Sequence, residues 1–300
     1  MKRISSYLFI AIAFLSGCVR EEPQETTSNT LRVSKRLNPG SAGPEELDLY
    51  AFRRSDGCLE TISSGSGDSI SVNLVKGREY NLYLIGNGHG IAEGIGDEEG
   101  FLQKRIRLED NDPSRPVFFS SAISYKCLDE EPLIGLRRYL SRISIREIRS
   151  EWLEDMPCKV TMIAVVNAAG SIPLSGIPDD KDICYNRAGV MDELSGRIRD
   201  MLVWEGEIDI RTSSMTGLSL YTLPSSSTRL AIRVAHGSEI NWYPVELPVM
   251  RCNTDYEIDC VVIKGPGSPG PDQEIDRRSV SFDITVKPWE NENIDVDFSI

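Results

Sequence analysis

The sequence predicts an all-β protein made of two tandem β-sandwich domains, with one short helix in the second domain. Short stretches of alternating apolar and polar side chains recur at a spacing of roughly 10–20 residues, the pattern of half-buried strands. Glycine, proline, asparagine and serine separate these stretches and favour turns. Only one stretch has apolar side chains at helical spacing, so strands do not alternate with helices as they do in parallel α/β proteins. A chain of 300 residues with 40% apolar residues can fill two cores of ordinary size.

The first domain is expected to begin at residue 31 and end at residue 146. Its strand candidates are Leu31–Leu37, Leu47–Phe52, Ile70–Leu74, Tyr80–Leu84 and Val117–Tyr125. Between them, Asn38–Pro44, Ser55–Gly57 and Ser63–Asp68 have the composition of loops and turns. Residues 18–30 are polar and contain a proline, so they are interpreted as a tether that precedes the fold.

The second domain is expected to cover residues 147–300. Ile143-Ser144-Ile145 leads into it, and two strands follow as alternating residues: Val160, Met162, Ala164 and Val166, then Leu230, Ile232 and Val234. The helix is predicted over Val190–Trp204, because apolar side chains recur there at helical spacing. Those side chains are Met191, Leu194, Ile198, Met201 and Leu202. They are interpreted as packing on the core, with a partner surface as the alternative.

The closing stretch, Met250–Ile300, predicts three more strands by the same alternation. The face expected to be buried carries Tyr256, Ile258, Cys260 and Val262 in the first strand, Val280, Phe282, Ile284 and Val286 in the second, and Ile294, Val296, Phe298 and Ile300 in the third. Pro288 cannot donate to a strand ladder and is expected to end the second strand. At Cys260 this face predicts a buried free thiol.

This closing stretch resembles the C-terminal part of the fimbrillins, the type V pilins of Bacteroidia. In that family an Arg-Asn-x-x-Tyr strand, a Gly-Pro-Gly turn and a Val-x-Pro-Trp strand follow one another. The matching residues are Arg251, Asn253, Tyr256, Gly265-Pro266-Gly267, Val286, Pro288 and Trp289. Cys252 separates Arg251 from Asn253, so the first motif is not exact. The resemblance extends weakly from about residue 31 to residue 300, and it implies two transthyretin-like sandwiches.

The N-terminus has the features of a lipoprotein signal peptide, expected to cover residues 1–17. Lys2 and Arg3 precede an apolar segment, Tyr7–Leu15, which is too short to span a membrane as a mature helix. Leu15-Ser16-Gly17-Cys18 resembles a lipobox, so cleavage is expected between Gly17 and Cys18, with acyl chains such as palmitate attached to Cys18. Several acyl chains would hold the protein on the outer membrane. An ordinary signal peptide or a signal anchor is the alternative.

Composition argues against several other classes of function. A net charge of −13 excludes the basic surface that nucleic-acid binding needs. His89 and His236 are the only histidines, and no C-x-x-C motif occurs, so no cofactor and no metal site are expected. Gly265–Gly270 matches G-x-G-x-x-G, but its prolines forbid the helix that a dinucleotide site requires. We expect no enzyme, although a pair of carboxylates for glycoside hydrolysis depends on a separation that sequence does not give.

The family resemblance implies assembly by strand exchange. In the family an N-terminal strand fills a groove, an Arg-specific protease removes it, and a C-terminal strand of the next subunit takes its place. Carried over, Leu31–Lys35 would leave after cleavage at Arg36, with Arg32 a poorer cleavage site. The donor strand would carry Ile294, Val296, Phe298 and Ile300, and the preceding strand, with Val280, Phe282, Ile284 and Val286, is the alternative donor.

The resemblance therefore predicts a structural subunit of a cell-surface fimbria that acts in adhesion. Its partners would be other fimbrial subunits, joined head to tail, with the outer membrane and surface receptors as further partners. An outer-membrane anchor or accessory lipoprotein of the fimbria is one alternative. A glycan-binding surface lipoprotein is another, and it would need an exposed aromatic platform. Asp68-Ser69-Ile70 also resembles an O-glycosylation site of the same bacterial group, with Ser69 as the acceptor.

Overall fold

A computed structural model describes most of the chain beyond the N-terminal segment. The described residues are 26–32, 34–35, 43–66, 69–88, 90–127, 134–152, 157–179, 181, 183–185, 194, 196–210, 217–271, 273–276, 278–289 and 294–297. Within them the fold is all-β, with two short α-helices, α1 (Glu98–Gln103) and α2 (Gly196–Leu202), and one 3-10 turn, η1 (Leu108–Asp110). The expectation of an all-β fold is confirmed. Neither helix has the length and apolar character needed to cross a membrane.

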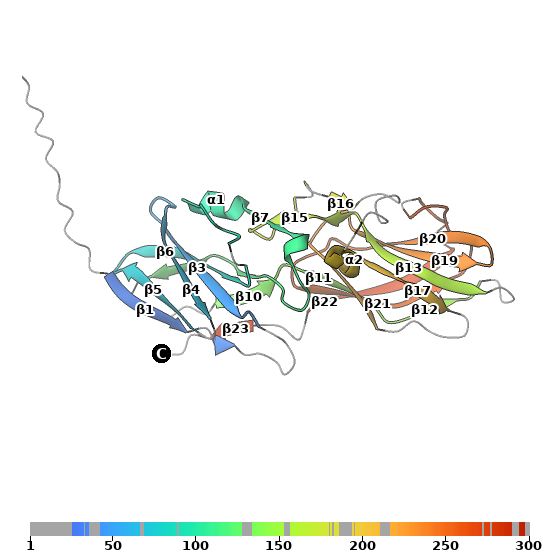
Figure 1. Ribbon diagram of the computed structural model, residues 1–300, viewed down its shortest axis with the longest axis horizontal. Coiled ribbons are helices and arrows are strands. Elements are labelled where there is room, and N and C mark those ends of the chain that lie inside the picture. The colour runs from blue at the N-terminus through green and yellow to red at the C-terminus, as the bar shows by residue number, and fades with distance from the viewer. Residues whose placement is uncertain are drawn as a thin grey trace, which may run out of the picture.

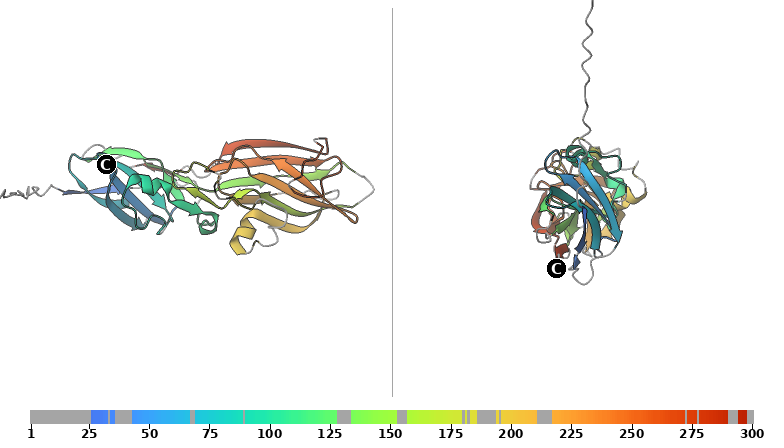
Figure 2. Two further views of the ribbon diagram at one scale, coloured as in Figure 1. Left: turned by 90° about the horizontal axis from the view of Figure 1, so that it is seen from above. Right: turned by 90° about the vertical axis from the view of Figure 1, so that its left-hand side faces the viewer.

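Two lobes lie end to end along the long axis of the molecule (Figures 1 and 2). The N-terminal lobe contains an eight-stranded sheet and a two-stranded sheet. The larger sheet has the order β2 (Ser34–Lys35), β23 (Ile294–Asp297), β10 (Ile134–Arg138), β8 (Phe118–Ser120), β6 (Glu79–Gly86), β3 (Glu46–Arg53), β4 (Leu59–Ser66), and β9 (Ile123–Lys126) also pairs with β6. The smaller sheet consists of β1 (Thr26–Arg32) and β5 (Ser69–Val75).

The core of the N-terminal lobe lies between these two sheets. Ile70, Val72 and Leu74 of β5 face it and are almost completely buried. They pack with alternate residues of the larger sheet, among them Leu49 and Leu82. The other face of the larger sheet packs on α1, where Tyr50, Phe52, Tyr83 and Phe101 form an aromatic cluster. Strand β5 alternates because one of its faces is buried, whereas β3 and β6 carry apolar residues on both faces because both faces of the larger sheet are covered there.

The C-terminal lobe is a sandwich of a five-stranded and a four-stranded sheet. The five-stranded sheet contains β22 (Val280–Pro288), β21 (Thr254–Ile263), β11 (Ser141–Ile145), β12 (Ile148–Ser150) and β18 (Leu218–Thr222). The four-stranded sheet has the order β17 (Val203–Asp209), β13 (Cys158–Val166), β19 (Arg229–His236), β20 (Glu239–Glu246). Short pairs, β14 (Ala168–Ala169) with β16 (Ile183–Tyr185) and β15 (Ser171–Pro173) with β7 (Arg105–Arg107), complete the described strands.

The chain changes sheet between β10 and β11. Arg138 is the last residue of a strand in the first lobe, and Ser141 is the first residue of a strand in the second. The last described strand, β23, pairs with β10 in the first lobe. The division at residues 146 and 147 into two folding units stays a prediction, since sheet membership alone does not define independent units.

A β-bulge changes the alternation in β21 and corrects the expected burial of Cys260. Tyr256 and Ile258 are buried as expected, but the pairing with β22 shifts between Ile258 and Val261. The extra residue in a bulge moves the following side chains to the opposite face. Val261 is consequently fully buried, whereas Cys260 is only half-buried, so the expectation of a buried thiol there is wrong.

The helix in the second lobe is shorter than its predicted span. It begins at Gly196 and ends at Leu202, and residues 190–193 lie outside the described part of the chain. Val203 and Trp204 instead begin β17, because β-branched and aromatic residues favour a strand that can pair with β13. Met201 and Leu202 are buried, and Ile198 packs against the same core. The interpretation of this stripe as core packing is confirmed for these residues.

Candidate functional site

The N-terminal segment covers one edge of the N-terminal lobe. Strand β1 pairs antiparallel with β5 along seven residues, from Thr26 opposite Val75 to Arg32 opposite Ser69. Among the described strands, β1 is the only ladder partner of β5. Without β1, the backbone N–H and C=O groups along β5 would form an open edge, which other extended chains can fill.

The same N-terminal segment then reaches the larger sheet. Ser34 and Lys35 form β2, opposite Asp297 and Val296 of β23. Strand β23 also pairs antiparallel with β10, where Val296 lies opposite Ile134 and Ile294 opposite Leu136. The strand expected to be the donor is thus held between β2 and β10 in the N-terminal lobe of its own chain. Phe298 and Ile300, the other two expected donor residues, lie outside the described residues.

The strand expected at Leu31–Lys35 is found as parts of β1 and β2, and β1 begins earlier, at Thr26. The segment Thr26–Thr30 was expected in the tether, because it has no apolar alternation. Its threonines still suit a strand, and pairing with β5 satisfies its backbone groups. Ser69 is the first residue of β5, next to the end of β1. Arg36, Cys18 and Gly17 lie outside the described residues, so their roles stay predictions.

The alternative donor strand, β22, is built into the C-terminal lobe. It pairs with β21 from Val280 opposite Ile263 to Pro288 opposite Thr254. Val280 is buried, whereas Val286 is 51% exposed at the far end of the same face. Removal of β22 would take a whole strand from this sheet, whereas β23 is not part of it. Strand β22 ends at Pro288, as its missing amide hydrogen predicts.

Asn253, Tyr256 and Trp289, which belong to the motifs of the closing stretch, lie where the two lobes join. Asn253 has a backbone φ of 54°, a left-handed conformation that asparagine adopts more readily than most residues. Its amide donates to the carbonyl of Leu140 at 3.1 Å, and its carbonyl accepts from the amide of Trp289 at 3.1 Å. The Tyr256 hydroxyl closes the preceding turn, because it donates to the Val249 carbonyl at 2.9 Å and accepts from the Arg251 amide at 2.8 Å. We call this meeting point the junction.

The side chain of Trp289 contacts two arginines at the junction. The guanidinium carbons of Arg138 and Arg142 are each 4.7 Å from its ring centroid, and Tyr221 stacks on it at 5.8 Å. Arg138 also lies over the ring of Phe118 at 5.2 Å. Burial and then the nearby Arg142 guanidinium lower the pKa of Arg138 to about 10, so this arginine is charged at neutral pH and faces aromatic rings.

Charged side chains continue from the junction along the outer face of β11, β21 and β22. Arg142 forms an ion pair with Asp255 at 2.7 Å, and Asp255 is almost fully buried beneath it. Glu257, one step further along β21, forms ion pairs with Arg146 and Lys287. Basic side chains on both sides of β21 thus pair with its acidic residues: Arg142 of β11 and Arg146 just after it on one side, and Lys287 of β22 on the other.

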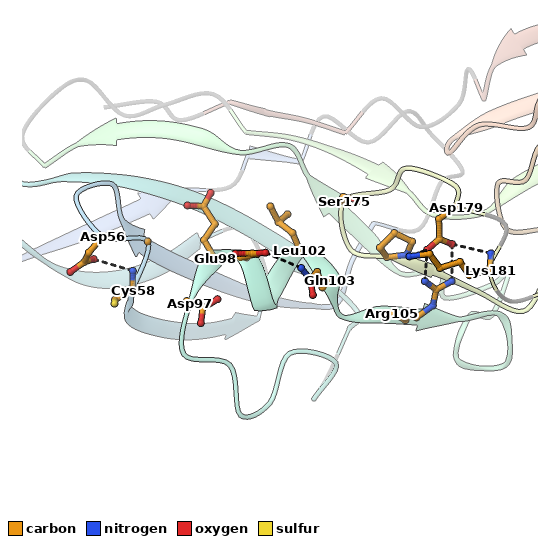
Figure 3. A pocket seen from close by; sticks show the side chains of 13 residues that line it. Asp56, Cys58, Asp97, Glu98, Leu102, Gln103, Arg105, Ser175, Asp179 and Lys181 are labelled. Atoms are coloured by element: carbon orange, nitrogen blue, oxygen red, sulfur yellow. Dashed lines mark hydrogen bonds and ion pairs between the residues drawn. The ribbon is translucent and has the colours of Figure 1, made fainter.

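A cleft separate from the junction lies beside α1. It has a volume of about 1100 Å³ and is lined on one side by α1 and the Asp56–Cys58 turn, and on the other by residues of 173–181 (Figure 3). Arg105 crosses from β7 to form a bidentate ion pair with Asp179, at 2.7 and 3.0 Å, and also donates to Ser171. The hydrogen bond from Arg105 is the main reason that the pKa of Asp179 falls to about 2.

The carboxylates at the other end of the cleft have structural contacts. Asp97 caps α1 by accepting from the Gly100 amide at 2.7 Å. Glu98 accepts from the Tyr83 hydroxyl at 2.5 Å and from the Asn81 amide at 3.0 Å. The described residues contain no group of three or more side chains that could hold a metal ion. Asp97 and Glu98 thus hold α1 in place, Asp97 by capping the helix and Glu98 by bonding to the neighbouring strand β6.

The remaining sequence candidates for chemistry are also placed in the fold. His236 is buried in the C-terminal lobe, with its Nε2 3.2 Å from the Tyr243 hydroxyl, and His89 lies outside the described residues. Gly265–Gly270 forms a loop after β21, in which Ser268 bridges to Trp242. No helix starts in this loop, so its interpretation as a turn is confirmed.

The fold and the placement of both end segments define a class: two-lobed β-sandwich proteins whose N-terminal lobe binds both end segments of the chain. No family profile and no curated protein matches the sequence. Solved structures do share the fold. A candidate cell adhesion protein of Parabacteroides distasonis matches with a TM-score of 0.65 at 12% identity, over 89% of this chain and 100% of that one.

A second candidate cell adhesion protein, of Bacteroides eggerthii, matches with a TM-score of 0.64 at 14% identity, over 89% of this chain and 96% of that one. A fimbrillin of Porphyromonas gingivalis matches with a TM-score of 0.60 at 14% identity, over 87% of this chain and 96% of that one. The fold is therefore fimbrillin-like, as the sequence resemblance predicts. At such low identity the likeness concerns the fold alone.

Proposed function

We propose that this protein is a structural subunit of a cell-surface fimbria, that it acts in adhesion, and that it joins other subunits head to tail by strand exchange. The observation that carries the proposal is the pairing of both end segments within one lobe. Strands β1 and β2 come from the N-terminal segment, β23 comes from the C-terminal segment, and β2 pairs directly with β23. The fold shared with a fimbrillin supports the proposal.

In this proposal, one cut after Arg36 opens two edges. It would release Thr26–Lys35, which supplies the ladder partner of β5 and the outer neighbour of β23. A cut after Arg32 would leave β2 on the chain, which makes Arg36 the better cleavage site. The freed edge of β5 would accept a strand from another subunit, because extended segments readily add to an open sheet edge. Since donor and acceptor differ, the contact propagates as a filament.

After the cut, β10 would be the one remaining ladder partner of β23 among the described strands. In the described residues this pairing runs from Ile294 opposite Leu136 to Val296 opposite Ile134. A strand with one ladder partner opens at a lower free energy than a strand with two, so the same cut prepares both the acceptor edge and the donor strand. The intact N-terminal segment would therefore keep the subunit monomeric until it reaches the cell surface.

Acylation of Cys18 would bring the uncut protein to the outer membrane and hold it there. In a shaft subunit, the cut after Arg36 would then separate the subunit from its lipid. In an anchor or accessory lipoprotein of the fimbria, the N-terminal segment and the lipid would both stay. The two roles differ in one covalent feature, the first residue of the mature protein.

A glycan-binding lipoprotein is less well supported. The described chain contains Trp152, Trp204, Trp242 and Trp289, and each of them is buried or half-buried. The exposed large apolar residues in the described part of the chain are all aliphatic. Sugar-binding platforms need exposed rings, which these side chains do not provide.

The donor assignment is tested by placing the same charge on each candidate donor strand. Val296→Asp places a carboxylate in β23, and Val286→Asp places one in β22, where the valine is already 51% exposed. We expect Val296→Asp to abolish the ladder of multimers on an unheated denaturing gel of cell-surface protein, whereas Val286→Asp should leave it unchanged. Normal assembly of the Val296→Asp protein would remove β23 as the donor, and loss of assembly only in Val286→Asp would assign β22.

A further inference from the structure

Trp289 stands between a strand of the C-terminal lobe and a strand that pairs in the N-terminal lobe. On its N-terminal side, β22 forms a ladder with β21 from Val280 to Pro288. On its C-terminal side, the next described strand, β23, pairs in its described residues with β10 and β2 of the N-terminal lobe. Contacts that fix Trp289 therefore lie between β23, the strand proposed to exchange, and β22, which remains in the C-terminal lobe.

Contacts from both lobes hold Trp289. The residue is 4% exposed, and its ring contacts both Arg138, from β10 of the N-terminal lobe, and Arg142, from β11 of the C-terminal lobe. Its amide donates to Asn253, whose own amide donates to Leu140 in the segment that links the lobes. Arg142 is fixed in turn by its ion pair with the buried Asp255. Trp289 is thus held at two places, through its ring by the arginines and through its backbone amide by Asn253. None of these three partners lies in the segment that follows Trp289.

We propose that Trp289 is the positioning residue for the exchanging strand and fixes the point at which that strand leaves the C-terminal lobe. This inference rests on the proposed strand exchange. When β23 detaches from β10, unpairing stops at Trp289 and does not continue into β22. The strand then departs from a constant point, from which the five residues to Ile294 can span at most about 18 Å. The acceptor edge of a neighbouring subunit must begin within that distance.

A tryptophan at this site can contact both arginines with one ring. The quadrupole of an indole attracts a guanidinium over its face, most strongly where the pair is desolvated. Two such contacts on one ring both favour the observed position of the side chain. A smaller apolar residue would be buried equally well but would lack the contacts with the two guanidinium groups.

The test is segment-resolved hydrogen exchange on the purified full-length chain with its N-terminal segment intact. In the wild-type protein, we expect amides of β23 to exchange faster than those of β22. In Trp289→Ala, exchange of the amides of Thr285–Lys287 should rise at least tenfold, while β13 and β19 keep their protection. Trp289→Phe should restore most of the protection in β22, because an aromatic ring can again contact both arginines. Trp242→Ala, which removes an indole that contacts Arg233 in the opposite sheet, should leave β22 unchanged.

Unchanged exchange in β22 of Trp289→Ala, or an equal rise throughout the C-terminal lobe, would overturn the inference, because the latter would make Trp289 an ordinary core residue. If Trp289→Ala does not fold, Arg138→Leu carries the test. It removes the guanidinium of the N-terminal lobe and leaves the ring in place, so a severalfold rise confined to Thr285–Lys287 is expected, and no rise overturns the inference. Exchange is measured on the monomer, so its outcome is separate from the assembly result for Val296→Asp.

Discussion

His236 is the buried titratable side chain whose surroundings lead to a measurable pH effect. Its imidazole packs edge-on against Trp152, lies 3.2 Å from the Tyr243 hydroxyl and 4.0 Å from the Cys158 sulfur, and has Glu239 as the nearby charge. Its Nδ1 is buried and has no hydrogen-bond partner among the described residues. Burial lowers the pKa of His236 below 6.5, more than Glu239 raises it, so the folded protein keeps this side chain neutral.

We therefore expect the C-terminal lobe to lose stability as the pH falls below about 6.5. The unfolded chain binds a proton there and the folded chain does not, so the free energy of unfolding decreases with falling pH, and the contribution is fully present above that range. Thermal midpoints measured from pH 8 to pH 5 should fall more steeply for the wild type than for His236→Gln. His89→Gln, at the other histidine of the chain, is the control. Parallel curves for the wild type and His236→Gln would contradict this assignment.

Single residues also show what the sequence could and could not predict locally. Pro288 ends its strand as expected, because its lack of an amide hydrogen is a property of the residue itself. The burial of Cys260 was predicted wrongly, because the bulge after Ile258 follows from the pairing between β21 and β22 and leaves no sign in the alternation. The contacts of Trp289 with Arg138 and Arg142 join segments about 150 residues apart, so no local pattern could reveal them.

At the scale of elements, the sequence predicts the strands that have alternating apolar residues. It does not predict which strands pair with one another. The alternation in β5 and β22 identified each strand, because one face of each packs on a core, and in β6 every second residue from Tyr80 to Leu84 packs on the core between the two sheets. Strand β1 begins in a polar segment, and only its ladder with β5 makes it a strand. The return of β23 to the N-terminal lobe depends on β10 and β2, which are distant in sequence.

This arrangement predicts which elements respond when the N-terminal segment is removed. Treatment of the folded protein with an Arg-specific protease should raise hydrogen exchange in β5 at least tenfold, because β5 loses its only described ladder partner. Exchange in β23 should also rise, since β2 leaves its outer edge. Strands β13 and β19 of the C-terminal lobe serve as internal controls. If β5 keeps its protection after Thr26–Lys35 has been removed, the N-terminal segment does not guard an acceptor edge.

At the scale of the whole molecule, the two lobes are joined by contacts that suit an extended subunit. Leu140, in the segment that links the lobes, accepts a hydrogen bond at the junction. A second set of contacts joins the lobes where β7 pairs with β15, next to the ion pair of Arg105 with Asp179. The Tyr139 hydroxyl donates to the Leu174 carbonyl at 2.7 Å between these regions. The lobes therefore lie end to end (Figure 2), with both exchange-related segments in the N-terminal lobe.

The central claim is that a cut at the end of the N-terminal segment converts a closed subunit into one that exchanges strands. The most direct measurement is the N-terminus of the protein on intact cells, by mass spectrometry, with the same sample run unheated on a denaturing gel. The account predicts a chain that begins at Leu37, together with a ladder of multimers. A chain that begins at acylated Cys18 but still forms the ladder would contradict the claim, because assembly would then proceed with Thr26–Lys35 in place.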